Sequence, residues 1–218
     1  MTFLVVATFK SNKNKAEILE WIKAVEPSTQ IVVAPPFPYL YLFADSGLTL
    51  AAQDVSPFPP GSYTGAINAR QLKEFGVSYV IIGHSERRKY FHETAIDVAA
   101  KARELLSSGI TPIICLEEKD INEQFVALDD ELFDKCIYCY EPMSGIGGTT
   151  TAPRDVIENV RSQVQSYVPG ARFMYGGSVT DENAGNLLSL NLAGFLVSTA
   201  SLNPDHYKRI LEVVKNGS

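Results

Sequence analysis

The strongest constraint on the fold is a regular alternation of short apolar runs, rich in β-branched residues, with segments of helical periodicity. The runs are apolar on nearly every position, which is typical of parallel strands covered on both faces. Each is followed by a helix-like segment, and the clearest of these begins at Thr94 and ends at Gly109. The expected strands lie at 3–8, 31–36, 48–53, 77–83, 111–115, 135–140, 171–177 and 193–198. The expected helices lie at 16–25, 39–47, 68–76, 93–109, 123–133, 153–168, 180–191 and 205–216.

Eight strand–helix pairs predict an α/β protein with a closed (β/α)8 barrel, and no linker divides residues 1–218 into more than one domain. A doubly wound open sheet is the structural alternative, but no G-x-G-x-x-G pattern follows the first strand. The longest irregular stretch is 53–66, and loops of that length in compact domains usually have a function or lie at an interface.

Composition limits the class of protein. The chain has 218 residues, 45% of them hydrophobic, and a formal net charge of −6. These values argue against disorder, and the absence of a basic stripe argues against a nucleic-acid partner. The N-terminal apolar run is too short for a signal peptide, and no run is long enough to cross a membrane. A cytoplasmic protein is therefore expected.

The three cysteines are best interpreted as reduced structural thiols. Cys136 and Cys139 have C-x-x-C spacing, which also occurs in metal and redox sites. Residues three apart on a strand point to opposite faces, and no second Cys/His pair completes a zinc set. No metal is expected.

Polar residues follow several of the predicted strands. Lys10, His84 and Glu141 come at the ends of the first, fourth and sixth strands, and Gly176 and Gly177 end the seventh. Taken singly, the lysine could be a solvated charge, the histidine a core residue and the glutamate the partner of an arginine. In a barrel, however, the carboxyl ends of all strands meet at one mouth, where active sites lie. There the three would form a base, a neutral donor and a cation.

Several motifs carry a resemblance to a known family. VIIGHSERR (80–88), CYEP (139–142), YGGSV (175–179), AGFLVSTASL (193–202) and APPFPYL (34–40) closely resemble the triosephosphate isomerases. AQDVSPFPPGSYTGAI (52–67) and the FK pair at 9–10 fit as well, and the matches follow the family's order nearly end to end. The resemblance implies a TIM barrel that needs no cofactor.

The resemblance also implies catalytic roles. In this family a glutamate base and a neutral histidine electrophile act together, and closure of a loop excludes water. By resemblance, Glu141 would move a proton between C1 and C2 of a triose phosphate. His84 would donate a hydrogen bond to the enediolate, and Lys10 would offset the negative charge. Ser85 and Glu86, in HSERR, match residues beside the site, and Glu86 would position the lysine.

The substrate phosphate would be bound at three places, and one of them departs from the family pattern. Gly147 and Ser178 match two phosphate contacts, whereas Ser198 and Thr199 stand where the family usually has two glycines. A β-branched threonine tolerates fewer backbone conformations than glycine, so phosphate affinity is open to question. Thr8, two residues before Lys10, replaces the usual asparagine.

The segment after Glu141 is a second departure. Ser144 replaces a bulky residue, and the run from Met143 to Thr149 differs from the family in its glycine content. Each extra glycine raises the entropy lost on ordering a lid by roughly 0.5–1 kcal/mol. Less frequent closure would lower activity without removing the chemistry. In the C-x-G-E stretch of the family, Glu117 replaces the glycine.

The resemblance further implies a homodimer, formed through the 53–66 loop, with a tetramer as another possibility. Tyr63 and Thr64 would lie at the loop tip, and Thr64 would reach Lys10 and His84 of the partner. Ala66 replaces a glutamate that pairs with a partner arginine in the family, so a weaker interface is expected.

Two functions therefore remain open at this point. The first is an active isomerase that interconverts dihydroxyacetone phosphate and D-glyceraldehyde 3-phosphate in glycolysis and gluconeogenesis, and Lys10, His84 and Glu141 favour it. The second is a barrel that binds a phosphorylated ligand or partner but catalyses poorly, as the departures at 144 and 198–199 would allow. A different phosphate-binding barrel enzyme is a third and weaker interpretation.

Overall fold

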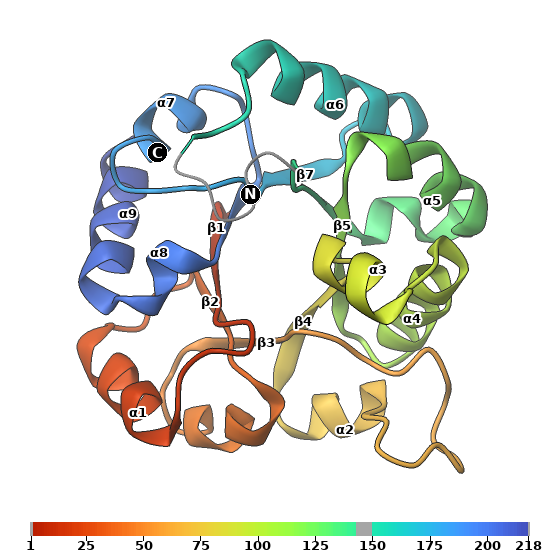
Figure 1. Cartoon of the computed structure of the whole chain (residues 1–218), viewed down its shortest axis with the longest axis horizontal. Coiled ribbons are helices and arrows are strands. Elements are labelled where there is room, and N and C mark those ends of the chain that lie inside the picture. The colour runs from red at the N-terminus through yellow and green to blue at the C-terminus, as the bar shows by residue number, and fades with distance from the viewer. Residues whose placement is uncertain (1, 143–149, 218) are drawn as a thin grey trace.

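The structure is a computed structural model that describes residues 2–142 and 150–217. Eight parallel strands form a closed barrel in which each strand pairs with its neighbours in sequence and β8 pairs with β1. Figure 1 shows this barrel surrounded by a ring of helices. The predicted (β/α)8 barrel is confirmed, and the open doubly wound sheet is excluded. The strands are β1 (Leu4–Thr8), β2 (Ile31–Ala34), β3 (Thr49–Ala52), β4 (Val77–Ile82), β5 (Thr111–Leu116), β6 (Ile137–Tyr140), β7 (Arg172–Tyr175) and β8 (Gly194–Val197).

Alternation along the strands divides the core into two layers, because successive side chains point to opposite faces. One cluster fills the barrel with residues two apart, such as Val6, Ile81, Ile113 and Met174. The intervening residues form the larger layer between strands and helices. Cys139 belongs to the inner cluster and Cys136 to the outer layer, and all three cysteines are unpaired. The interpretation of the C-x-x-C pair as opposite-facing free thiols is confirmed.

Helices surround the barrel, and several begin at a side-chain cap. Thr94, Asn14 and Asn68 each form a capping box, in which the cap side chain and the third helical residue exchange hydrogen bonds with the backbone. The helix that was expected to begin at Thr94 does so. The α-helices are α1 (Lys15–Ala24), α2 (Ala69–Glu74), α3 (Ser85–Phe91), α4 (Ala95–Ser107), α5 (Ile121–Ala127), α6 (Arg154–Tyr167), α7 (Ala184–Leu188), α8 (Thr199–Leu202) and α9 (Pro204–Gly217).

Some helical expectations need correction. The segment expected at 39–47 is a 3₁₀ helix, η1 (Phe37–Phe43), which follows Pro36 and includes Pro38 in its first turn. The single helix expected at 123–133 is divided between α5 and a second 3₁₀ helix, η3 (Asp130–Lys135), and a short η2 (Glu118–Asp120) precedes α5. Sequence periodicity also missed α3 and α8. Each has only one buried residue, Ser85 and Ser201 respectively, so neither has an apolar stripe.

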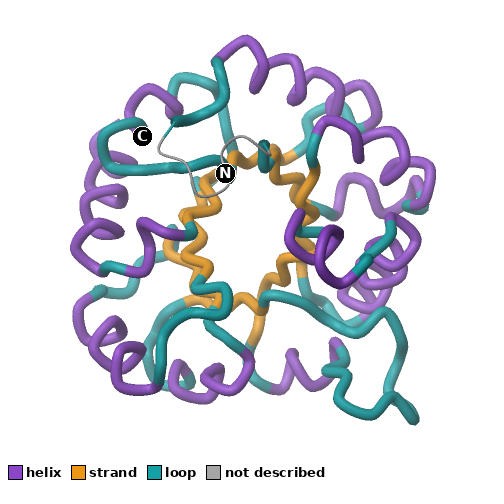
Figure 2. Tube along the Cα trace, in the orientation of Figure 1, coloured by secondary structure: helices purple, strands orange, loops and turns teal. Residues whose placement is uncertain are grey.

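The 53–66 loop has no helix or strand and extends outward beside α2, beyond the ring of helices (Figures 1 and 2). Across the two described ranges, no helix is long and apolar enough to cross a membrane. The segment predicted as a lid, 143–149, which contains Ser144 and Gly147, lies outside the described residues.

Candidate active site

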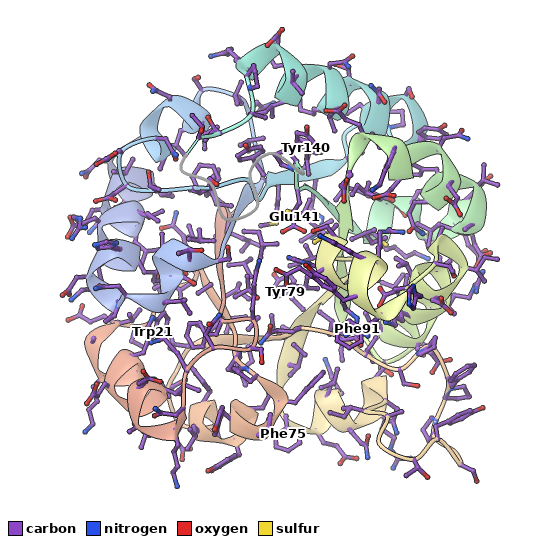
Figure 3. All side chains as sticks on the ribbon, viewed as in Figure 1. Trp21, Phe75, Tyr79, Phe91, Tyr140 and Glu141 are labelled. Carbon is purple, nitrogen blue, oxygen red and sulfur yellow. The ribbon has the colours of Figure 1, made fainter. Side chains whose placement is uncertain are left out.

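The alternation inside the barrel explains why Glu141 and Lys10 lie at its mouth. Ile137 and Cys139 of β6 point into the barrel, so Glu141 continues the same face just past the end of the strand. Thr8 and Lys10 likewise continue the inner face of β1, on which Val6 lies deeper in the barrel. Glu141 is buried, and Figure 3 shows it on the inner side of the barrel wall.

His84 reaches the site through a break in the alternation of β4. Gly83 has a φ of 68°, in the left-handed region, and this turn places His84 at the start of α3. Any side chain at position 83 would be strained, and its Cβ would lie 2.9 Å from the Arg88 guanidinium. The Glu86 amide donates to His84 Nδ1 at 3.1 Å. Since Nδ1 accepts this bond, the ring proton of the neutral imidazole is on Nε2.

The Nε2 atom of His84 faces Glu141 across the barrel mouth. It lies 3.1 Å from Glu141 Oε1, although neither Nε2 nor Glu141 Oε2 has a partner in hydrogen-bond geometry among the described residues. Burial raises the pKa of Glu141, but His84 and Lys10 outweigh it and hold that pKa below its ordinary value. Glu141 is thus a carboxylate at neutral pH. Burial lowers the pKa of His84, while the Glu141 charge raises it and prevails in this arrangement.

Gly176 makes room for the Glu141 side chain. A Cβ at position 176 would lie 3.0 Å from Glu141 Cγ, 3.2 Å from Cys139 Sγ and 3.3 Å from Leu196 Cβ. All three neighbours point into the barrel, where little movement is possible. Gly176, just past the end of β7, therefore determines the space available to Glu141.

Lys10 follows β1 and is held by Glu86. Its Nζ donates to Glu86 Oε1 at 2.8 Å, and its backbone has a φ of 49°. Left-handed backbone at a residue other than glycine is uncommon and gathers at functional sites. Lys10, His84, Glu86 and Thr8 line one cavity of about 330 Å³. Ser85 Oγ is buried and has no hydrogen-bond partner among the described residues, and Ser85 lines a second cavity on the other side of Glu86, with Glu117 and Lys119.

The predicted phosphate contacts lie just past the ends of β7 and β8. Ser178 has a φ of 51°, and its carbonyl accepts from Asn183 Nδ2 at 2.8 Å. Ser198 immediately precedes α8. Thr199 is exposed and is the first residue of this helix, so its amide N–H lies at a helix start. Backbone amides in such positions can bind anions. The third predicted contact, Gly147, is outside the described residues.

The predicted interface residues are not part of the cavity within one chain. Tyr63 is exposed and stacks on Phe58, with ring centroids 4.5 Å apart, and Thr64 is exposed beside it. Both lie in the loop that extends away from the barrel.

Sequence reasoning missed a cluster of charged side chains beside the site, two of them buried and two partly exposed. Asp54, Arg87, Glu93 and Lys101 form a connected set of ion pairs. A lysine on the apolar face of a predicted helix was the available signal, since Lys101 lies among Val98, Ala102 and Leu105 of α4. Within the two described ranges, no cluster of three or more His, Cys, Asp or Glu side chains could hold a metal ion.

Comparisons with known proteins identify the family. The triosephosphate isomerase family model matches residues 3–214. The triosephosphate isomerase of Polynucleobacter asymbioticus is 34% identical and aligns with 96% of this chain and 98% of its own length. That of a Wolbachia species from Brugia malayi is 34% identical, with 99% of each chain covered. That of Thermus thermophilus is 34% identical, with 96% and 98% covered. Because the family model and these relatives span nearly the whole barrel, the chain belongs to the triosephosphate isomerase family.

Proposed function

We propose that this protein is an active triosephosphate isomerase, which interconverts dihydroxyacetone phosphate and D-glyceraldehyde 3-phosphate through an enediolate. The observation that carries the proposal is the Glu141 carboxylate facing His84 Nε2 at 3.1 Å, with Lys10 in the same barrel mouth. Its supports are the family membership and the named activity of the relatives. We take residues 1–218 as one catalytic domain.

Glu141 is the proposed base. Its carboxylate is ionised, buried and free of a tight hydrogen bond on Oε2 among the described residues, so it can accept a proton from carbon. A carboxylate removes a proton from carbon effectively only where water is excluded and the developing oxyanion is stabilised. The same carboxyl group then returns the proton to the neighbouring carbon. The hydroxyl proton must also pass from O1 to O2, the two oxygens that His84 Nε2 faces, and this second transfer completes the exchange between ketose and aldose.

His84 is the proposed electrophile in its neutral form. When substrate lies in the mouth, its carbonyl oxygen takes the place of Glu141 beside Nε2. When Glu141 accepts the proton, it also loses the charge that raises the pKa of His84. Burial and the Glu86 amide on Nδ1 then both favour the neutral ring, which donates from Nε2 to the enediolate.

Lys10 and the segments that follow β7 and β8 bind the anionic substrate in this proposal. The Lys10 ammonium offsets the charge of the enediolate and phosphate, while Glu86 holds it in place at 2.8 Å. The amides near Ser178, Ser198 and Thr199 are the proposed phosphate donors, together with Gly147.

A coupled assay on glyceraldehyde 3-phosphate tests the activity, with wild type compared with Glu141→Asp. We expect turnover in wild type and a loss of about 100-fold or more in the variant, because shortening the side chain moves the carboxylate by about 1 Å. An enediolate-mimicking hydroxamate should still bind both proteins. If wild type binds the hydroxamate but shows no turnover, the poorly catalysing barrel is the correct function instead.

We further propose a homodimer in which the 53–66 loop enters the mouth of a second copy. The loop carries the exposed stacked pair Phe58 and Tyr63, and the cavity beside Lys10 is open to an incoming side chain. Position 66, where the family has a glutamate that pairs with a partner arginine, is alanine here, so this dimer would lack that intersubunit ion pair.

The proposed cellular setting follows from the proposed reaction. Interconversion of triose phosphates belongs to glycolysis and gluconeogenesis, and a cytoplasmic location fits that role. A tetramer built from two such dimers is the alternative assembly, and sedimentation distinguishes the two.

A further inference from the structure

Four charged residues beside the site form one cluster, in which Lys101 and Glu93 are buried and Asp54 and Arg87 are partly exposed. Lys101 Nζ lies 2.6 Å from Asp54 Oδ1 and 2.5 Å from Glu93 Oε2. The Arg87 guanidinium bridges the same two carboxylates, at 2.7 Å to each. The Lys101 side chain is only 4% exposed and that of Glu93 only 3%, so solvent does not screen the contact between them.

One side of this cluster holds the backbone before His84. Glu93 Oε1 accepts from the Gly83 amide at 2.9 Å, while Glu93 Oε2 is bound by Lys101 and Arg87. Gly83 is the left-handed residue that redirects the chain so that His84 faces the cavity. Movement of the Glu93 carboxylate would therefore be transmitted to His84 through a single peptide.

The other side of the cluster adjoins Gln53, which holds the backbone of Lys10. Asp54 follows Gln53, whose Nε2 donates to the Lys10 carbonyl at 3.1 Å. Lys10 is also left-handed, so its conformation depends on support from its surroundings. Asp54 and Arg87 line the cavity beside Lys10 and His84, and Lys101 belongs to the layer behind them, on the buried face of α4.

We propose that Lys101 is a positioning residue for the isomerase site, an inference that rests on the proposed function. Its ammonium holds Asp54 and Glu93 together. Glu93 binds the left-handed Gly83 peptide before His84, and Asp54 restrains the neighbouring Gln53, whose side chain binds the carbonyl of the left-handed Lys10. Lys101 thus acts on the distance between the cation and the electrophile from outside the cavity, which Asp54 and Arg87 line. The charge of Lys101, on α4, thus determines whether Lys10 and His84 face one cavity.

The first variant is Lys101→Met, which keeps the length of the side chain and removes its charge. We expect kcat to fall roughly tenfold or more, with KM within about twofold, because a displaced electrophile costs transition-state binding more than ground-state binding. The matched control is Arg103→Met on the same helix, which removes an exposed ion pair with Asp129. Its kcat and KM should equal those of wild type.

The second variant separates positioning from stability. Lys101→Met with Asp54→Asn removes one charge of each sign, so no uncompensated carboxylate remains buried and the melting temperature should recover toward wild type. A positioning role predicts that kcat stays low in this folded double variant. If kcat recovers together with the melting temperature, or if folded Lys101→Met keeps a kcat within about twofold of wild type, the proposal is wrong.

A spectroscopic readout makes the test independent of turnover. The ¹⁵N signals of the His84 imidazole, assigned by their loss in His84→Gln, should shift in the double variant and not in Arg103→Met. An unchanged His84 spectrum in the folded double variant overturns the positioning role. An inactive wild type overturns the proposed function instead, and the His84 spectrum then still decides whether Lys101 positions the ring.

Discussion

At the scale of single residues, the site depends on two glycines, which have no side chain, as much as on its charged residues. Gly83 allows the left-handed turn that presents His84, and Gly176 leaves the space that Glu141 occupies. In each case an added methyl group would meet neighbours that are themselves held in place. The site is therefore expected to respond to small substitutions that leave its charged groups intact.

Gly176→Ala tests this expectation directly. The added Cβ would lie 3.0 Å from Glu141 Cγ, so the carboxylate must shift, and we expect kcat to fall about 10- to 100-fold with little change in KM. Steady-state kinetics measure the effect. Gly185→Ala is the matched control, because its nearest neighbour would be Val213 at 3.8 Å, an ordinary contact. Equal kcat values for the two variants would show that Gly176 does not control the base.

Ser198→Gly combined with Thr199→Gly tests the departure at the proposed phosphate contact. We expect KM for glyceraldehyde 3-phosphate to fall and kcat to stay unchanged, because glycine lets the backbone approach the phosphate more closely. Inhibition by inorganic phosphate should strengthen in parallel. An unchanged or higher KM would show that the two side chains are neutral or helpful for binding.

At the scale of elements, side-chain caps stabilise the helix ends that are not buried against the barrel. Thr94 begins α4 with a capping box, and Asp97 accepts from both the Thr94 amide, at 2.9 Å, and its hydroxyl, at 2.7 Å. Because α4 also carries Lys101, its start affects both the stability of the barrel and the cluster beside the site.

Thr94→Ala should lower the free energy of unfolding by about 1 kcal/mol at neutral pH, measured by urea titration. Hydrogen bonds from Thr94 hold the pKa of Asp97 below its ordinary value. The contribution is therefore fully present above the unfolded-state pKa, about 4, and is lost as pH falls through the lower folded-state pKa. The difference between variant and wild type should shrink in that acid range. Ser107→Ala, an exposed position on the same helix, should change stability little at any pH.

At the scale of the whole molecule, the outward extension of the 53–66 loop is the feature on which the proposed dimer rests. Its aromatic pair is about half exposed, at 48% for Phe58 and 43% for Tyr63, although two stacked rings are costly to leave in water. A second copy that receives the loop in its barrel mouth would cover these rings and close the cavity.

Thr64→Arg tests the proposed dimer at the loop tip. We expect wild type to sediment as a dimer and the variant to shift toward monomer with lower kcat, because a long cation at the tip would meet Lys10 of the partner. Arg70→Ala, on the exposed face of α2, should sediment as wild type does. A wild type that sediments as a monomer at all concentrations would refute the proposed assembly.

Much of this molecule could be predicted from sequence because the relevant signals are local. The alternation of apolar runs and helical segments determined the eight strands and the closed barrel. Position at a strand end placed Lys10, His84 and Glu141 in one mouth, since the carboxyl ends of parallel strands meet there. The helices α3 and α8 escaped prediction because one buried residue in each leaves no periodic pattern to detect.

Only the tertiary structure decided which side chains touch. The ion pair of Lys10 with Glu86 joins residues that are 76 positions apart in sequence, and Lys101 contacts Asp54, which is 47 positions away. The space that Gly176 leaves for Glu141 likewise depends on how β6 and β7 lie side by side in the closed barrel. Periodicity along a strand tells which face a residue occupies, but a contact between strands depends on their register and on barrel closure. Those are set by the packing of the whole core, which no single segment encodes.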